Sequence, residues 1–181
     1  GAAISAARGL PDIGLISLTD MTREASAIAR SVALPTIVDA DTGYGPPSVV
    51  REAVQEFERA GLAGMQIEDQ EEAKKCGHLS GKRLIPTADM VAKITAAVEA
   101  KCDRDFVLVA RTDARAVDGL QAAIQRGVAY ANAGADALFP EALLSADEFH
   151  TFALEMNRAG VHLPLIANMT EFGKTPYLSV D

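Results

Sequence analysis

One cysteine of this chain lies in a setting that suits proton transfer. Cys76 follows Lys75 directly, and His78 comes two residues later. Positive charge near a thiol lowers its pKa from a free value of about 8.5, which makes the thiol a stronger acid near neutral pH. The alternative is a buried cysteine that packs as a small apolar residue, and this fits poorly among charged residues and glycines. The segment therefore predicts a cysteine that takes part in chemistry.

Two aspartates, Asp39 and Asp41, close an apolar run near the start of the chain. Residues i and i+2 of a strand point to the same side, so the two carboxylates form an oxygen-rich pair of the kind that binds Mg²⁺ or Mn²⁺. Gly43 and Gly45 follow and allow the loop to come close to a ligand. Asp41 could instead cap the turn, because Asp-Thr-Gly is common in turns. Glu68, at the end of the next apolar run, favours the cation site.

An arginine, Arg111, lies at the end of another apolar run. A guanidinium at the mouth of a barrel is costly unless an anion pairs with it, and its planar fork suits a carboxylate. The alternative is a structural pair with Asp113 or Glu141. Asn168 and Thr170 could donate hydrogen bonds to carboxylate oxygens or could be ordinary turn residues. These residues predict a site for a small acid.

The candidate residues follow short apolar runs that alternate with helical segments. The runs occupy residues 35–41, 63–69, 106–113, 136–141 and 164–168. Strand–helix alternation predicts parallel β–α units. An open doubly wound sheet gathers its ligands at one switch point, whereas a barrel draws site residues from the C-terminal ends of many strands. Polar residues end nearly every run here, and no Gly-x-Gly-x-x-Gly follows a strand, so we expect a (β/α)₈ TIM barrel.

A complete barrel of this type needs about 250 residues. With five full strands, residues 1–181 are therefore expected to form a single partial TIM-barrel domain that lacks the first strands and the C-terminal strand and helices.

Thr87 is expected to cap a helix that follows it, and the Ala-Gly pairs at 60–61, 133–134 and 159–160 are expected to end helices. Three further residues of reactive types are interpreted as surface or packing residues: His150, His162 and Cys102.

Composition limits the class of protein. The 181 residues are 49% hydrophobic, and 17 Lys and Arg against 25 Asp and Glu give a net charge of −8. This charge argues against nucleic acid and anionic membranes as partners, and no apolar run reaches the ~18 residues of a membrane span.

Two cysteines without framework spacing are typical of a reducing compartment, so we expect a cytoplasmic protein. Because the first residue is not methionine, we expect the chain to begin partway into a longer protein.

The motifs resemble those of the isocitrate lyase / phosphoenolpyruvate mutase superfamily. The similar segments occur in the family's order at residues 9–12, 39–45, 67–70, 74–78, 110–114, 139–142 and 167–176. The Lys-Lys-Cys-Gly-His block at 74–78 resembles the lyase side of the superfamily, and the segment 168–176 is most similar to that of 2-methylisocitrate lyases. The resemblance implies a Mg²⁺-dependent (alternatively Mn²⁺-dependent) carbon–carbon lyase that splits 2-methylisocitrate into pyruvate and succinate in propionate breakdown.

The same resemblance implies roles for individual residues. The matches to the metal ligands are Asp39 and Asp41, with support from Glu68 and Asp12. The residues expected in catalysis are Cys76, as the proton donor to the succinate-side carbanion, and His78, Lys74 and Glu68. The residues expected to bind substrate are Gly1, Ala2, Cys76, Gly77, Arg111, Glu141, Asn168, Met169 and Thr170. Phe139 is expected to contact the methyl group that distinguishes 2-methylisocitrate from isocitrate, a difference of about 1–3 kcal/mol.

Other functions stay open at this point. Within the superfamily they are 2,3-dimethylmalate lyase, oxaloacetate hydrolase and carboxyphosphonoenolpyruvate phosphonomutase, of which the mutase needs no thiol acid. Outside it, the chain could be a non-catalytic barrel that binds a metabolite.

The family's candidate base is a tyrosine in a Tyr-x-Ser-Gly segment, and this chain begins at that glycine. We therefore expect the 181 residues alone to be inactive. Relatives exchange a C-terminal helix between subunits, which implies a homo-oligomer, a tetramer, for the full-length protein.

Overall fold

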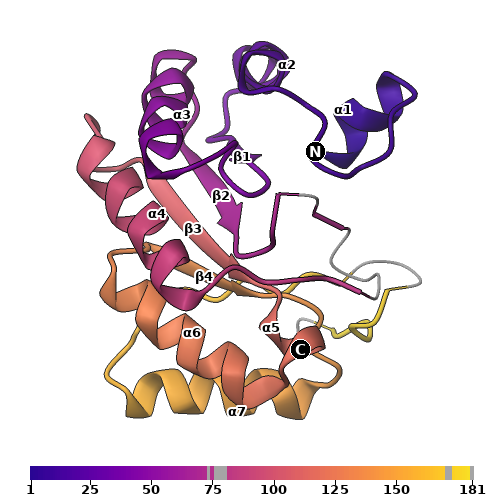
Figure 1. Cartoon of the computed structure of the whole chain (residues 1–181), viewed down its shortest axis with the longest axis vertical. Helices are drawn as coiled ribbons and strands as arrows, with labels where there is room; N and C mark the ends of the chain where they lie inside the picture. The colour runs from indigo at the N-terminus through magenta and orange to yellow at the C-terminus, as the bar shows by residue number, and fades with distance from the viewer. Residues whose placement is uncertain (73, 76–80, 170–172, 180–181) are drawn as a thin grey trace.

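The centre of the structure is a sheet of parallel strands (Figure 1). The structure is a computed structural model that describes residues 1–72, 74–75, 81–169 and 173–179. Within these residues the sheet has four strands, β1 (Ile37–Asp39), β2 (Gly64–Glu68), β3 (Val107–Thr112) and β4 (Ala137–Pro140). Each strand pairs with the next one along the chain, in the order β1-β2-β3-β4. The sequence predicts this consecutive parallel order.

Helices connect the strands and cover one side of the sheet. Helices α3 (Pro47–Arg59), α4 (Thr87–Ala100) and α6 (Leu120–Asn132) lie between successive strands, and α7 (Ala146–Arg158) follows β4. Figure 1 shows these helices in sequence along one side of the sheet, where α3 contacts α4, α4 contacts α6, and α6 contacts α7. Two helices precede β1, α1 (Ala2–Ala7) and α2 (Leu18–Ser31), and a single short turn, α5 (Ala114–Val117), follows β3.

Apolar periodicity explains why the helices pack as they do. In α3 the residues Val50, Ala53, Val54 and Phe57 follow the i, i+3, i+4, i+7 pattern and are all fully buried. Pro47 occupies the first turn of α3, where its missing N–H is no loss. The helix therefore presents one continuous apolar stripe to the sheet.

The strands present different side chains to their two faces. One face packs against the helices in the main core, which contains Met65, Ile67, Leu108, Ala110 and Leu138 from the strands and Phe57, Ile94 and Phe152 from the helices. The other face carries a small separate cluster of Val109, Ala137 and Phe139 with Val107 and Ile166. Alternation along a strand places Arg111 on the same face as Val109. The helix-free face therefore carries the polar groups at the strand ends.

The fifth expected strand is only partly formed. Residues 164–166 run beside β4, where Leu165 makes one parallel bridge to Leu138. The N–H of Leu138 donates to the carbonyl of Pro164 at 3.0 Å, and the N–H of Ile166 donates to the carbonyl of Leu138 at 2.9 Å. The described residues thus contain four strands and one bridged segment, so the expectation of five full strands is corrected to that extent. The direction and position of the segment agree with the prediction.

Glycines end three of the helices as predicted. Gly61, Gly134 and Gly160 follow α3, α6 and α7 with φ angles of 82°, 103° and 77°, the left-handed region that glycine adopts without a Cβ clash. The expectation for Thr87 is wrong. Thr87 is the first residue of α4, Pro86 is the residue before the helix, and no side chain caps this end.

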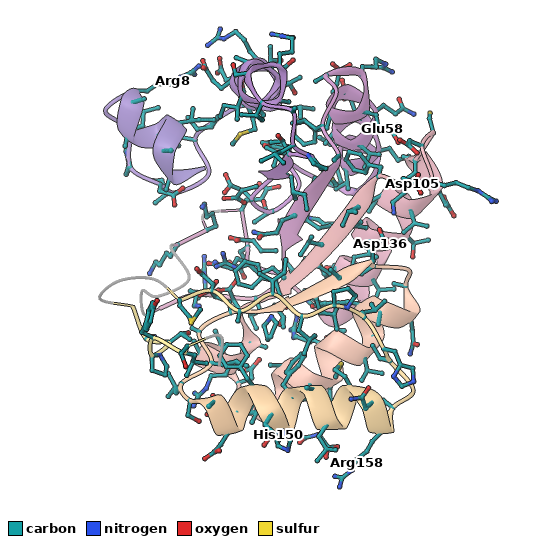
Figure 2. All side chains as sticks on the ribbon, turned by 180° about the vertical axis from the view of Figure 1, so that it is seen from behind. Arg8, Glu58, Asp105, Asp136, His150 and Arg158 are labelled. Atoms are coloured by element: carbon teal, nitrogen blue, oxygen red, sulfur yellow. The ribbon has the colours of Figure 1, made fainter. Side chains whose placement is uncertain are left out.

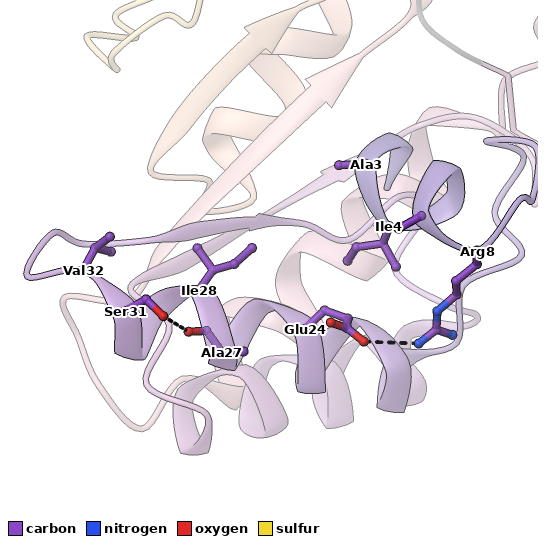
Figure 3. A pocket seen from close by; sticks show the side chains of 9 residues that line it. Ala3, Ile4, Arg8, Glu24, Ala27, Ile28, Ser31 and Val32 are labelled. Carbon is purple, nitrogen blue, oxygen red and sulfur yellow. Dashed lines mark hydrogen bonds and ion pairs between the residues drawn. The ribbon is translucent and has the colours of Figure 1, made fainter.

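A groove separates α1 from α2 (Figure 3). It has a volume of about 550 Å³ and is lined mainly by apolar side chains, among them Ala3, Ile4, Ile28 and Val32. At one end of the groove Arg8 and Glu24 form an ion pair, with 3.4 Å between the guanidinium and the carboxylate. The groove lies between the two helices that precede β1. None of the described helices has the length and apolar content to cross a membrane.

Candidate functional site

Four strand ends bring polar side chains to one edge of the sheet. The strand pairing aligns Asp39 with Gln66, Glu68 with Arg111, and Arg111 with Phe139. Aligned residues in parallel strands lie on the same face, so these side chains are neighbours as the sequence predicts. Glu141, the residue after β4, extends the row. The C-terminal ends of the strands therefore form one continuous polar surface.

An acidic group occupies the end of this surface at β1. The Nζ atom of Lys74 lies 2.8 Å from Asp12 Oδ1 and 2.8 Å from Asp41 Oδ1. The nitrogen of Gly1 lies 3.2 Å from Asp39 Oδ2. A Cβ atom placed on Gly1 would stand 3.0 Å from Asp41 Oδ1, 3.1 Å from Asp12 Oδ1 and 3.3 Å from Asp39 Oδ2. Three carboxylates thus converge on one point, and the ammonium group of Lys74 neutralises part of their charge.

The loop after β1 holds Asp41 in an uncommon backbone conformation. Asp41 has φ 48° and Tyr44 has φ 64°, both in the left-handed region that costs energy for residues other than glycine. The buried Nζ of Lys93, on α4, donates to the carbonyl of Thr42 at 2.8 Å. A Cβ on Gly43 would lie 2.8 Å from Val50 Cγ2. Contacts from two helices therefore fix this loop and keep Asp41 aimed at Lys74.

Burial and neighbouring charges set the protonation chemistry of the two aspartates. Burial raises the pKa of Asp41, the adjacent charge of Asp39 raises it further, and the ion pair with Lys74 opposes both. Burial also acts to raise the pKa of Asp39, where the charge of Lys74 and the N–H of Asp41 oppose it. Burial alone would lower the pKa of Lys74, yet its bonds to Asp12 and Asp41 raise it. Asp12 and Asp41 therefore hold Lys74 firmly in its charged form.

A second group surrounds Arg111, whose side chain is 11% exposed. Its Nε and Nη2 atoms donate to the two oxygens of Asp113, each at 3.0 Å. Nε also lies 3.4 Å from Glu68 Oε2, and Nη1 lies 3.4 Å from Glu141 Oε2. The guanidinium carbon stands 5.3 Å from the centre of the Phe139 ring. Arg111 therefore makes the structural pairs that the alternative interpretation expected, with three carboxylates at once.

Burial dominates the electrostatics of this second group. It raises the pKa of Glu68 to about 8, against the opposing charge of Arg111. Burial also acts to raise the pKa of Asp113, but Arg111 and Lys82 outweigh it and hold that pKa below its ordinary value. Lys82 donates to Asp113 Oδ1 at 2.6 Å, and both side chains are almost fully buried. Glu68 is thus a carboxyl that keeps its proton near neutral pH, whereas Asp113 stays ionised.

Comparison with known proteins gives this edge of the sheet a context. The family model described as phosphoenolpyruvate phosphomutase matches residues 1–179. The chain belongs to this family. The resemblance seen in the motifs is thereby confirmed, and the α/β fold with its parallel sheet is that of the superfamily, so these strands correspond to part of a TIM barrel.

Relatives and solved structures of the family agree with this assignment. A 2-methylisocitrate lyase of Aeropyrum pernix is 55% identical over 181 residues, which are 100% of this chain and 56% of that protein. The crystal structure of 2,3-dimethylmalate lyase, a PEP mutase/isocitrate lyase superfamily member, is 37% identical with a TM-score of 0.91, over 98% of this chain and 58% of that one. A structure of oxaloacetate acetylhydrolase with the inhibitor 3,3-difluorooxalacetate is 37% identical with a TM-score of 0.92. The match covers 99% of this chain and 61% of that one. The chain spans a little over half the length of such proteins.

Most of the predicted site residues lie along this edge in the family fold. The two groups contain Gly1, Asp12, Asp39, Asp41, Glu68, Lys74, Arg111 and Glu141. Asn168 Nδ2 donates to Glu141 Oε2 at 3.4 Å, which brings the segment after the bridge to the same place. Met169 is 38% exposed and its sulfur accepts from the N–H of Leu178 at 3.1 Å. Ala2 is exposed in α1. Cys76, Gly77, His78 and Thr170 lie outside the described residues.

The residues interpreted as surface positions are exposed. His150 lies on the outer side of α7 (Figure 2). His162 is exposed, with its Nδ1 atom 2.9 Å from Asn157 Oδ1. Cys102 is a free, exposed cysteine. None of the three belongs to the candidate site.

Sequence reasoning missed three residues that support the site. Lys82 pairs with Asp113, and Lys93 holds the loop after β1. The Nε2 atom of Gln70 donates to Glu68 Oε1 at 3.0 Å and to the carbonyl of Lys75 at 2.8 Å. Gln70 continues the i, i+2 spacing of Glu68, a signal that could have identified it. Nothing in the local sequence distinguishes Lys82 and Lys93 from surface lysines.

Proposed function

We propose that the full-length protein is a divalent-cation-dependent carbon–carbon lyase that cleaves 2-methylisocitrate into pyruvate and succinate. One observation carries the proposal: a cation-binding acidic group and a buried arginine lie next to each other at the C-terminal ends of neighbouring strands. The 55% identity to a protein named 2-methylisocitrate lyase supports the choice of substrate. The solved structures of other superfamily members are less similar in sequence, at 37%.

The charge of the site supports a role for a divalent cation. The two groups contain three cationic side chains, those of Lys74, Lys82 and Arg111, and six carboxyl side chains, those of Asp12, Asp39, Asp41, Glu68, Asp113 and Glu141. Even with Glu68 largely neutral near pH 7, the carboxylates outnumber the cations. A substrate with two or three carboxylates adds more negative charge to this set. Additional positive charge is therefore needed where the substrate binds.

The donor atoms fit Mg²⁺ or Mn²⁺. Asp39, Asp41 and Asp12 present hard oxygen atoms, which these ions prefer. As the described residues stand, no three His, Cys, Asp or Glu side chains form a ready metal-binding group, because Lys74 lies between Asp12 and Asp41. We propose that Asp39 and Asp41 hold the ion and that Lys74 then keeps Asp12. When bound, the ion supplies Lewis-acid stabilisation of the charge that develops beside the hydroxyl-bearing carbon.

The arginine group is proposed to hold the opposite end of the substrate. Arg111 already binds carboxylates on both sides of its planar fork. Because Glu68 has a pKa of about 8, its carboxyl is largely neutral near pH 7 and competes weakly for the guanidinium. A substrate carboxylate can then take the place of Glu68 beside Nε. Asn168, which donates to Glu141, is proposed as a further donor. Phe139, 5.3 Å from the guanidinium carbon, offers an apolar surface near this position.

The proposed reaction breaks the bond between the hydroxyl-bearing carbon and its neighbour. The hydroxyl proton leaves to a base, the hydroxyl carbon becomes the ketone of pyruvate, and the bond's electron pair stays on the succinate side. Cys76, which lies outside the described residues, is proposed to return a proton to that carbon. Lys74 and Gln70 hold the described start of its segment against Asp41 and Glu68. His78 and Gly77 are proposed to share the site with Cys76.

A panel assay on the full-length protein tests the function. Pyruvate or the corresponding product is measured after addition of 2-methylisocitrate, isocitrate, 2,3-dimethylmalate or oxaloacetate with Mg²⁺. We expect the highest kcat/KM with 2-methylisocitrate. A higher kcat/KM with any other member of the panel would reassign the substrate, and no turnover with any of them would contradict the lyase. We also propose a cytoplasmic homo-oligomer, on the cysteine content and the resemblance to the family.

A further inference from the structure

A fully buried carboxylate lies directly behind the candidate site. Asp69 follows Glu68, and the two side chains leave the chain on opposite sides of the sheet. The carboxylate of Asp69 is 0% exposed. It accepts hydrogen bonds from the hydroxyl of Thr112 at 2.7 Å, the N–H of Asp113 at 2.9 Å, the hydroxyl of Tyr130 at 2.7 Å and Arg126 Nη1 at 3.1 Å. Asp69 therefore joins β2, the end of β3 and helix α6.

The same contacts fix the turn that follows β3. The hydroxyl of Thr112 donates to Asp69 and accepts from the N–H of Ala114 at 3.2 Å. Arg126 also donates to the carbonyl of Ile85 from Nη1 and Nη2, each at 3.1 Å. The N–H of Ile85 donates in turn to the carbonyl of Asp69 at 3.0 Å. Among the described residues, no fully buried side-chain polar atom of Asp69, Thr112, Tyr130 or Arg126 is without a hydrogen-bond partner, which favours a single rigid arrangement.

The turn carries the residue that orients Arg111. Asp113 binds Asp69 through its backbone N–H, and its side chain binds Arg111 with both oxygens and Lys82 with one. The bidentate pair with Arg111 has little tolerance, because both N–H···O bonds need one relative orientation of two planar groups. A small shift of the Asp113 backbone would therefore turn the guanidinium away from the substrate.

We infer that Asp69, held by Tyr130 and Arg126 of α6, is a positioning residue that sets the orientation of Arg111 through the backbone of Asp113. The inference rests on the proposed function, in which Arg111 binds a carboxylate of the substrate. Asp69 touches neither the substrate nor the reacting atoms. Its replacement is expected to weaken carboxylate binding while the chemical step proceeds at nearly the same rate.

The test uses the full-length protein with two variants and two matched controls. Tyr130→Phe removes one hydrogen bond to Asp69, and Asp69→Asn removes its charge. Tyr177→Phe makes the same chemical change at a tyrosine that is 89% exposed. Ile124→Val removes a methyl group from the same helix, so it reports on lost packing alone. Succinate binding by calorimetry is measured beside KM and kcat for 2-methylisocitrate, and thermal unfolding is recorded for each variant.

We expect the Kd for succinate and the KM to rise about threefold to tenfold in Tyr130→Phe and about tenfold or more in Asp69→Asn, with kcat within about twofold. Both controls should bind as the wild type does. In an Arg111→Lys background, Tyr130→Phe should have little further effect on Kd, because the group that it positions is gone. An unchanged Kd in Tyr130→Phe, or an equal loss in Ile124→Val, would overturn the inference. Succinate binding without cleavage by the wild type would contradict the proposed lyase alone, whereas absence of succinate binding would overturn both.

Discussion

Glu68 and Arg111 are aligned partners in neighbouring parallel strands, and their side chains approach to 3.4 Å on the helix-free face of the sheet. The pairing fixes their separation through the backbone, independently of any loop. Arg111 also holds Asp113 and Glu141, so a single guanidinium is shared by three carboxylates from three strand ends. Because the guanidinium of Arg111 has several carboxyl partners, a substrate carboxylate can replace one of them while the others stay bound.

Replacing Arg111 separates its two roles, binding and stability. Arg111→Lys keeps the positive charge but loses the fork, so KM for 2-methylisocitrate should rise about tenfold or more. Arg111→Met removes the charge and leaves buried carboxylates without their partner, which should cost about 3 kcal/mol or more in the free energy of unfolding. Steady-state kinetics and urea unfolding of the full-length protein measure the two effects. A methionine variant as stable as the wild type would show that the carboxylates do not depend on Arg111.

Removal of divalent cations should stop turnover, and Mg²⁺ or Mn²⁺ should restore it. Asp39→Asn should lower the affinity for Mg²⁺ at least tenfold, because it replaces a charged ligand in an oxygen-only set. Asp105→Asn, at an exposed position before β3 (Figure 2), is the matched control. Mg²⁺ binding by calorimetry and activity after chelation give two independent measurements. Full activity after exhaustive chelation would contradict the metal assignment.

Much of this arrangement could be predicted because parallel strands impose it. Asp39, Glu68, Arg111 and Glu141 each follow a short apolar run. The C-terminal ends of such strands meet at one edge of the sheet, so spacing alone places these residues together. The order of strands and helices follows from the same periodicity. The ends of α3, α6 and α7 could also be predicted, because each is followed by a glycine that adopts the left-handed conformation which ends a helix.

The remaining features depend on contacts that no local pattern encodes. Lys82 and Lys93 are buried by the path of the chain around them, and both read as ordinary solvated lysines in sequence. Asp69 looks like one more acidic residue beside Glu68. Alternation places it on the opposite face, but only the packing of α6 reveals its partners Tyr130 and Arg126. The segment at 164–166 has the composition of a strand but forms a single bridge to β4, and the extent of strand pairing is not encoded in composition alone.

Cys76→Ser should abolish cleavage of 2-methylisocitrate while the fold and Mg²⁺ binding persist. A serine hydroxyl is a far weaker acid than a thiol, so the loss should appear in kcat, by about 10²-fold or more. Cys102→Ser is the control, because Cys102 is exposed and its N–H binds Glu58, away from the strand ends. Single-turnover kinetics separates the chemical step from product release. Wild-type kcat in the Cys76→Ser protein would show that Cys76 is not the proton donor.

Acid should weaken the junction between α5 and α7 through Glu148. Arg115 donates to Glu148 from Nε at 2.9 Å and from Nη2 at 2.6 Å, and Glu148 also accepts from the N–H of Leu144 at 2.9 Å. These bonds, the one from Arg115 above all, hold the pKa of Glu148 below the ordinary 4.5. A carboxylate with a lowered folded-state pKa stabilises the protein above its unfolded pKa, and this contribution disappears as the pH falls through the folded-state value.

Glu148→Gln tests this pH dependence, because glutamine has the same shape and never ionises. At pH 7 the variant should be less stable than the wild type by up to about 1 kcal/mol, the range of a partly exposed ion pair. The difference should shrink as the pH falls below about 4.5, the ordinary pKa of the unfolded chain, and through the lower pKa of the folded state, where the wild-type carboxylate also becomes neutral. Urea unfolding of the full-length protein at pH 7, 5 and 3.5 measures it, with Glu52→Gln at an exposed position of α3 as the control. A difference that stays constant across this range would show that the charge of Glu148 contributes nothing to stability.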